Sequence, residues 1–74
     1  MKTTVLKMLK DLKPECDFEG SKDYIEDEFL DSFDILTLIS EIEEEFDCYI
    51  DPMDILAENF QTADSICSLI EKSR

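Results

Sequence analysis

The chain has 74 residues, a formal net charge of −13, 43% hydrophobic residues and no histidine. This length allows a single domain, 1–74, and the hydrophobic content is too high for a disordered chain. Residues 23–71 contain sixteen acidic residues and no lysine or arginine, which argues against nucleic acids and anionic membranes as partners and favours basic protein surfaces.

Apolar residues at helical spacing predict a first amphipathic helix over residues 3–12, and Pro14 ends it. Lysines interrupt this segment, so it lacks the apolar core of a signal peptide, and no stretch of the chain reaches transmembrane length. We therefore expect no insertion into a membrane. Residues 14–31 are predicted to form a long loop, a feature that is often functional in a compact domain. Its expected anchors to the core are Phe18, Tyr24, Ile25, Phe29 and Leu30.

The second predicted helix covers residues 32–46. Its core-facing stripe is Ile35, Leu38, Ile39, Ile42 and Phe46. Phe33 and Leu36 lie outside this stripe at 100° per residue, so the pattern places two apolar side chains on the solvent side. Ser32 stands at the beginning of this helix, where its hydroxyl group is a candidate cap for the first turn.

Two further helices are predicted after residue 50. Asp51 as N-cap and Pro52 at the first helical position indicate a short helix over residues 52–58, buried through Ile55 and Leu56. Thr62 is the expected cap of a last helix, whose inward-facing residues are Ile66, Leu69 and Ile70. The expected fold is all-α: a four-helix bundle with a short third helix and a long first loop.

The composition also limits the chemistry. Nucleophilic catalysis by Ser32 requires a nearby base, which is normally a histidine, and the chain has none. The three cysteines, Cys16, Cys48 and Cys67, match no zinc or redox spacing. Reduced thiols in the cytoplasm are the expected state. We expect no catalytic residue and no metal centre.

One stretch keeps a metal alternative open. The segment "ECDFEGSKDYIE", residues 15–26, resembles the calcium loop of an EF-hand, with acids or oxygen ligands at positions 1, 3, 5, 7, 9 and 12 and glycine at position 6. It departs from that loop in having Glu15 at position 1, Glu19 at position 5 and Lys22 where an apolar residue belongs. The alternatives are therefore an acidic calcium-binding module and a solvated acidic loop.

Three segments together resemble the acyl carrier protein family: "LDSFDILTLISEIEEEF", "YIDP" and "NFQTADSICSLI". The resemblance covers nearly the whole chain and implies a carrier that is not an enzyme. It implies that Ser32, which follows Asp31, receives 4′-phosphopantetheine from coenzyme A through a separate magnesium-dependent transferase, making the carrier a phosphoprotein. The thiol of the arm then holds an acyl or aminoacyl group as a thioester and moves it between enzymes.

The resemblance suggests a function for the two apolar residues on the solvent side, Phe33 and Leu36. Phe33 and Leu36 are next to the attachment serine, and we expect them to form an apolar docking patch. The acidic rim expected around it consists of Asp31, Asp34, Glu43, Glu44 and Asp47. Such a surface suits weak binding to basic partners. The expected partners are a phosphopantetheinyl transferase, an acyl- or aminoacyl-activating ligase and acyl-accepting enzymes. The carrier itself is expected to be a monomer.

The sequence also carries information about the cargo. Fatty-acid carriers usually have Gly-x-Asp-Ser, whereas Phe29 stands at the place of that glycine, so "FLDSF" is more similar to D-alanyl carrier proteins. Positions that line the chain cavity of fatty-acid carriers align with Ile35, Ile55 and Ile66, whose side chains should fill the space that a chain needs. We expect a short or polar cargo such as D-alanine. A fatty-acid-type carrier with long-chain cargo is the alternative.

Overall fold

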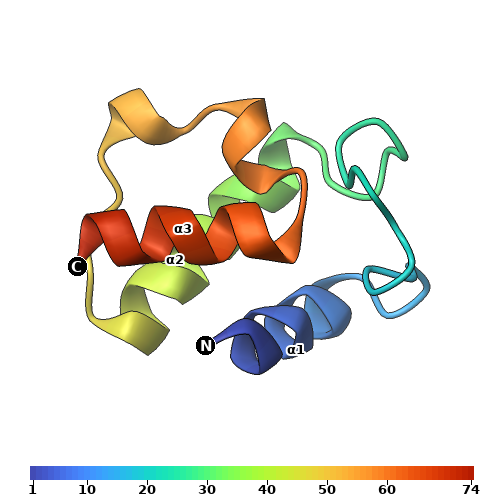
Figure 1. Ribbon diagram of the computed structural model, residues 1–74, viewed down its shortest axis with the longest axis horizontal. Coiled ribbons are helices and arrows are strands. Elements are labelled where there is room, and N and C mark those ends of the chain that lie inside the picture. The colour runs from blue at the N-terminus through green and yellow to red at the C-terminus, as the bar shows by residue number, and fades with distance from the viewer.

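A computed structural model describes all 74 residues. It contains three α-helices, α1 (Lys2–Leu12), α2 (Ser32–Phe46) and α3 (Ala63–Ser73), and two short 3-10 helices, η1 (Pro52–Asp54) and η2 (Ala57–Phe60), without a β-strand. In Figure 1, α3 crosses in front of α2, α1 lies below them, and the long loop forms the right-hand side. None of the helices has both the length and the apolar content needed to span a lipid bilayer.

One cluster of buried apolar side chains joins the three α-helices. Its members are Val5, Leu9, Phe18, Tyr24, Leu30, Leu38, Ile39, Ile42, Ile50, Phe60, Ala63, Ile66, Leu69 and Ile70. The apolar stripes predicted for the first, second and last helices all contribute to it, so these stripes are confirmed. The predicted cap of the last helix is also confirmed, because the Thr62 Oγ1 atom accepts a hydrogen bond from the Ser65 N–H at 3.0 Å.

The long loop is tied to the core by aromatic side chains, as the sequence predicts. Phe18 packs edge-on against Tyr24, with 4.9 Å between ring centroids, and against Phe29 at 5.4 Å. The Tyr24 hydroxyl oxygen accepts a hydrogen bond from the Ala63 N–H at 3.1 Å. The Tyr24 N–H donates to the Gln61 carbonyl oxygen at 2.7 Å. These bonds hold the loop against the beginning of α3 and leave its last residues to lead directly into α2.

The prediction of a third α-helix over residues 52–58 is wrong. The structure has η1 and η2 there, separated by Ile55 and Leu56, of which Leu56 is extended with φ −120° and ψ 143°. Leu56 is also not buried, since 48% of its surface is exposed, whereas Ile55 packs partly against the core. The fold therefore has three α-helices instead of the four that were expected.

A side-chain hydrogen bond explains why the helix breaks here. In an α-helix the Asp54 carbonyl oxygen would accept the N–H of residue 58. Instead it accepts from the Asn59 side-chain amide at 2.6 Å and from the Leu56 N–H at 2.9 Å. The Asp54 carboxylate binds the Lys72 ammonium group at 2.9 Å. These contacts turn the chain at Ile55 and hold η1 against the end of α3.

Candidate functional site

The first turn of α2 is closed by two aspartates. The Asp31 Oδ1 atom accepts a hydrogen bond from the Asp34 N–H at 2.9 Å, and the Asp34 Oδ2 atom accepts one from the Asp31 N–H at 3.2 Å. This reciprocal pair is a capping box with Asp31 as the N-cap. The bond from the Asp34 N–H also lowers the pKa of Asp31 below its ordinary value.

Ser32 is therefore not the cap of α2, in contrast to the role that its position allows. It is the first residue inside the helix, and its side chain is exposed. The hydroxyl group takes no part in the capping box, so it remains available to solvent and to a partner protein. The side chains of Asp31 and Asp34, not the Ser32 hydroxyl, accept the hydrogen bonds from the backbone N–H groups of this turn.

Asp34 has a different place from the one expected of a docking residue. It is the single charged residue among the buried residues, with 7% of its surface exposed. Its Oδ2 atom binds the Lys13 ammonium group at 3.2 Å, and this contact raises the pKa of Lys13. Asp34 therefore belongs to the structure beneath the serine, and the prediction that it forms part of an exposed acidic rim is wrong.

An apolar hollow of about 490 Å³ opens beside Ser32. It lies between the beginning of α2 and the segment that contains η2. Its lining residues are Ile25, Leu30, Asp31, Ser32, Ile35, Leu36, Ile55, Leu56, Ala57 and Phe60. Leu36, Leu56 and Ala57 are exposed, so the hollow is open to solvent. The sequence analysis expected Ile35 and Ile55 to fill this space, whereas in the structure they form part of the wall of an open hollow.

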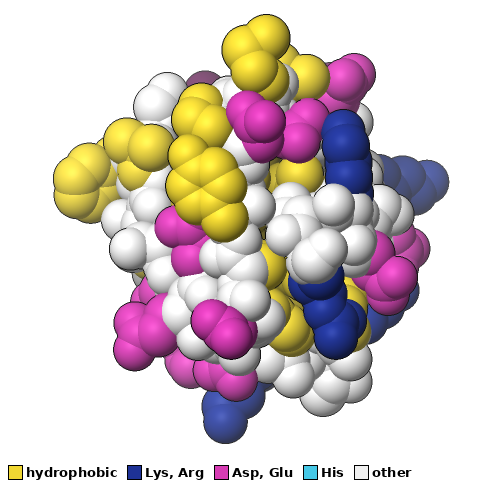
Figure 2. All heavy atoms as spheres, turned by 90° about the vertical axis from the view of Figure 1, so that its left-hand side faces the viewer, with side chains coloured by type: hydrophobic (Ala, Val, Ile, Leu, Met, Phe, Trp, Pro, Cys, Tyr) yellow, Lys and Arg dark blue, Asp and Glu magenta, His cyan; other side chains and the backbone are white.

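The expected apolar patch is present at the surface. Phe33 is 76% exposed and Leu36 is 60% exposed. The segment after α2 adds Tyr49, Met53 and Leu56 to the exposed apolar residues, which the sequence analysis did not include. Figure 2, which faces the side of the molecule where η1 lies, shows hydrophobic side chains gathered at the upper left with acidic side chains next to them.

The remaining acids of the predicted rim fall into two groups. Asp31, Glu44 and Asp47 are exposed. Glu43 is partly buried, and its Oε2 atom accepts a hydrogen bond from the Ile50 N–H at 2.9 Å, which fastens the segment after α2 to the helix. Glu43 therefore contributes charge to this face while it also has a structural role.

A family model described as the phosphopantetheine attachment site matches residues 3–70 of the chain. The chain belongs to this family. No curated protein and no solved structure matches it. Members of the family carry 4′-phosphopantetheine as a prosthetic group, and the domain is a carrier, not a catalyst. Carriers of this kind interact with phosphopantetheinyl transferases and with acyl-handling enzymes.

The surroundings of Ser32 in this carrier fit the group that the family holds. The serine hydroxyl is exposed at the N-terminus of α2. The positive end of a helix dipole stabilises a phosphodiester, which is the link between serine and the arm. The hollow beside Ser32 offers an apolar surface next to this hydroxyl group. This carrier therefore has an accessible hydroxyl group, a favourable field and an adjacent apolar surface in one place.

Residues 15–26 of the carrier do not have the arrangement that the calcium-binding alternative requires. The Asp17 Oδ1 atom accepts the Gly20 N–H at 3.1 Å, and the Asp23 Oδ1 atom accepts the N–H groups of Ile25 and Glu26, both at 3.0 Å. No group of three or more acidic, cysteine or histidine side chains converges with the spacing of a metal site. Asp17 and Asp23 thus stabilise turns of the loop itself.

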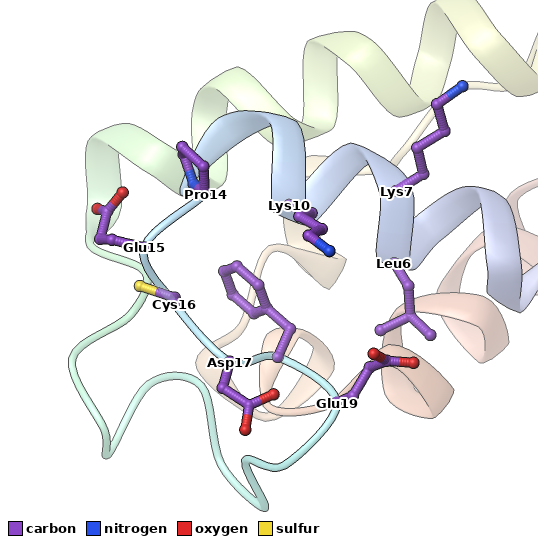
Figure 3. A pocket seen from close by; sticks show the side chains of 9 residues that line it. Leu6, Lys7, Lys10, Pro14, Glu15, Cys16, Asp17 and Glu19 are labelled. Carbon is purple, nitrogen blue, oxygen red and sulfur yellow. The ribbon is translucent and has the colours of Figure 1, made fainter.

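A second hollow of the carrier, of about 480 Å³, lies between α1 and the loop. Lys7 and Lys10 come to it from α1, and Asp17 and Glu19 come from the loop (Figure 3). Charges of both signs therefore line the same space. The lysines of α1 offset the acids of the loop here, and they do not form a uniformly basic surface.

Proposed function

We propose that Ser32 is the attachment site and that the protein is a stand-alone carrier of acyl or aminoacyl thioesters. The observation that carries this proposal is the exposed hydroxyl group of Ser32 inside a capped first turn, within a chain of the phosphopantetheine family. Three free cysteines, each partly buried, support a reducing compartment, and we place the carrier in the cytoplasm.

The attachment reaction is a phosphoryl transfer. The Ser32 Oγ atom attacks the phosphorus of coenzyme A that bears pantetheine, a new serine O–P bond forms, and the P–O bond of the pyrophosphate breaks. Adenosine 3′,5′-bisphosphate leaves, and the serine proton passes to a base of the transferase. The carrier has no histidine, so it presents the hydroxyl group while the transferase provides the base and the magnesium ion.

The exposed face around Ser32 is the proposed docking surface. Phe33 and Leu36 form its apolar centre, and Asp31, Glu44 and Asp47 supply negative charge. Negative charge accelerates encounter with basic partners, whereas the apolar contact sets how long the complex lasts. The proposed partners are the transferase, an activating ligase and acyl-accepting enzymes.

A short or polar cargo remains our proposal. Ile66 is completely buried and belongs to the apolar core, so it occupies interior space. Ile35 and Ile55 form part of the wall of the open hollow beside Ser32. A short group can rest against this wall, but a long chain would have to displace close-packed core residues, at a cost of about 1–3 kcal/mol. The hollow itself favours cargo with some apolar surface, so a longer acyl chain is the second candidate.

Intact-mass measurement tests the attachment. Incubation with coenzyme A and a broad-specificity phosphopantetheinyl transferase should add one phosphopantetheine to the wild type and to Ser40→Ala, an exposed serine of the same helix. The Ser32→Ala variant should gain none. Loading of Ser32→Ala to the extent of the wild type would overturn the proposal.

Methyl NMR spectra of the loaded carrier test the cargo. The alanyl form should leave the Ile66 methyl signals unchanged. An octanoyl group should at most shift Ile35 and Ile55, because these residues line the open hollow. Large shifts at Ile66 with octanoyl would show that a chain enters the core, and the proposal of a short cargo would then be wrong.

A further inference from the structure

Lys13 follows α1 directly, yet its side chain reaches the beginning of α2. Its own backbone is held on both sides, since the Lys13 N–H donates to the Leu9 carbonyl oxygen at 2.9 Å and the Lys13 carbonyl oxygen accepts from the Cys16 N–H at 3.1 Å. The base of the side chain is therefore fixed. Figure 3 shows Pro14 and Glu15 at the end of α1, next to the green ribbon in which α2 begins.

The Lys13 ammonium group and the Asp31 N–H share one acceptor. Both lie 3.2 Å from the Asp34 Oδ2 atom. Because a buried carboxylate is costly without a partner, Asp34 needs an opposite charge beside it in this position. Residues 23–71 have no lysine or arginine, so the charge has to come from another part of the chain. Lys13 supplies it.

This ion pair differs from the other two in the protein, Lys2–Asp64 and Lys72–Asp54. In the latter pair, the Lys72 side chain is 68% exposed and the Asp54 side chain is 21% exposed. Lys2 and Asp64, which join α1 to the beginning of α3 at 3.1 Å, have side chains that are 58% and 78% exposed. The side chains of Lys13 and Asp34 are 31% and 11% exposed. Exposed pairs contribute little to stability because water competes with them. The Lys13–Asp34 pair is the more protected one, and it lies beneath the turn that contains Ser32.

We propose that Lys13 is a positioning residue for the attachment reaction: by pairing with Asp34, it fixes the capped first turn from which Ser32 accepts the arm. The inference rests on the function proposed above for Ser32. Residues 31–34 are held by the two bonds of the capping box, and the acceptor of one of them is held by Lys13. Without Lys13, the Asp34 carboxylate turns toward water, the Asp31 N–H loses its acceptor, and the first turn frays.

The test compares transfer of phosphopantetheine to the full-length wild type, Lys13→Met, Lys13→Arg and Lys2→Met, with kcat and KM measured for one transferase well below the melting temperature of every variant. Lys2→Met is the matched control, because it removes the same charge and also breaks a pair between α1 and another helix. Lys13→Met should lower kcat/KM about five- to tenfold, whereas Lys13→Arg and Lys2→Met should remain within about twofold of the wild type.

A double-mutant cycle separates positioning from a general loss of stability. Asp34→Asn removes the charge that Lys13 neutralises but keeps an oxygen acceptor for the Asp31 N–H. In this background, Lys13→Met should cause no further fall in the rate. Amide exchange of the Asp31 and Asp34 N–H groups should accelerate in Lys13→Met and not in Lys2→Met. If Lys13→Met alone is poorly folded, the comparison of Asp34→Asn with the double variant still tests the proposal, because equal rates are expected for these two proteins.

The outcomes distinguish the two proposals. If the wild type is loaded at Ser32 and Lys13→Met is loaded as fast as Lys2→Met, the positioning role is wrong and the attachment site stands. Additive effects of Lys13→Met and Asp34→Asn would also overturn the positioning role. A wild type that takes no phosphopantetheine would overturn both.

Discussion

The two ends of α2 use acidic residues in opposite ways. At the N-terminus, the carboxylates of Asp31 and Asp34 accept hydrogen bonds from backbone N–H groups, at the positive end of the helix dipole. At the C-terminus, Glu44, Glu45 and Asp47 lie at the negative end of the dipole, and the last turn contains no basic residue. The same residue type therefore stabilises one end of the helix and destabilises the other.

The backbone shows the same contrast. Asp31 has the extended conformation that suits an N-cap, with φ −106° and ψ −177°. Asp47 has φ 50° and ψ 54°, a left-handed conformation that favours glycine. The end that presents Ser32 is thus well formed, whereas the other end keeps unfavourable charge exposed. Exposed acids of this kind accelerate association with basic partners, although they reduce the stability of the helix end.

Truncation of one acidic side chain at each end of α2 should reveal the largest difference between the two ends. Asp34→Ala removes an acceptor of the capping box and leaves Lys13 without its partner, so we expect it to lower the free energy of unfolding by about 2–3 kcal/mol. Glu44→Ala should change that free energy by less than about 0.5 kcal/mol. Urea unfolding followed by circular dichroism measures both. Equal losses would show that the two ends do not differ as described.

Charge reversal near the C-terminal end of α2 tests whether the exposed acids there guide association with partners. Glu44→Lys should slow association with the transferase about three- to tenfold at low ionic strength, and the difference from the wild type should shrink as salt is added. Glu45→Lys is the control, because it changes charge equally but points away from Leu36 at 100° per residue. Stopped-flow measurements give the association rates. If both variants associate like the wild type, the acidic face does not guide docking.

The smallest expected effect is a gain in stability at the C-terminal end. Asp47→Gly should raise the free energy of unfolding by about 0.5–1 kcal/mol, because glycine adopts the left-handed conformation without strain and the change removes a negative charge from the end of the dipole. Thermal unfolding checks it, with Asp51→Gly as the control. Asp51 caps η1 and has φ −63°, so the control should not gain stability. A loss of stability in Asp47→Gly would contradict this view of the end of α2.

Local patterns were sufficient to predict much of this fold. Helical spacing identified the buried stripes of α1, α2 and α3, and Thr62 was recognisable as a cap because capping depends on residues a few positions apart. The choice of cap for α2 was less clear, since Asp31 and Ser32 are both good caps. The spacing of Asp31 and Asp34 by three residues is the signal that could have indicated the capping box, which the sequence analysis did not predict.

The features that the sequence did not predict depend on contacts between distant residues. The third helix breaks where the Asn59 amide and the ammonium group of Lys72 bind Asp54, and the second of these contacts spans eighteen residues. Lys13 follows α1 and Asp34 lies in the first turn of α2, so no periodic pattern indicates their pairing. Because this pairing could not be predicted, the sequence analysis assigned Asp34 to the surface. In the structure Asp34 is buried and pairs with Lys13.

Peptide mapping of the loaded protein tests the central claim most directly. After incubation with coenzyme A and the transferase, proteolysis and tandem mass spectrometry should locate a single phosphopantetheine on the peptide that contains Ser32, with fragment ions assigning it to that residue. Modification at Ser21, Ser40, Ser65 or Ser68 in place of Ser32 would contradict the claim that the capped first turn of α2 presents the attachment site.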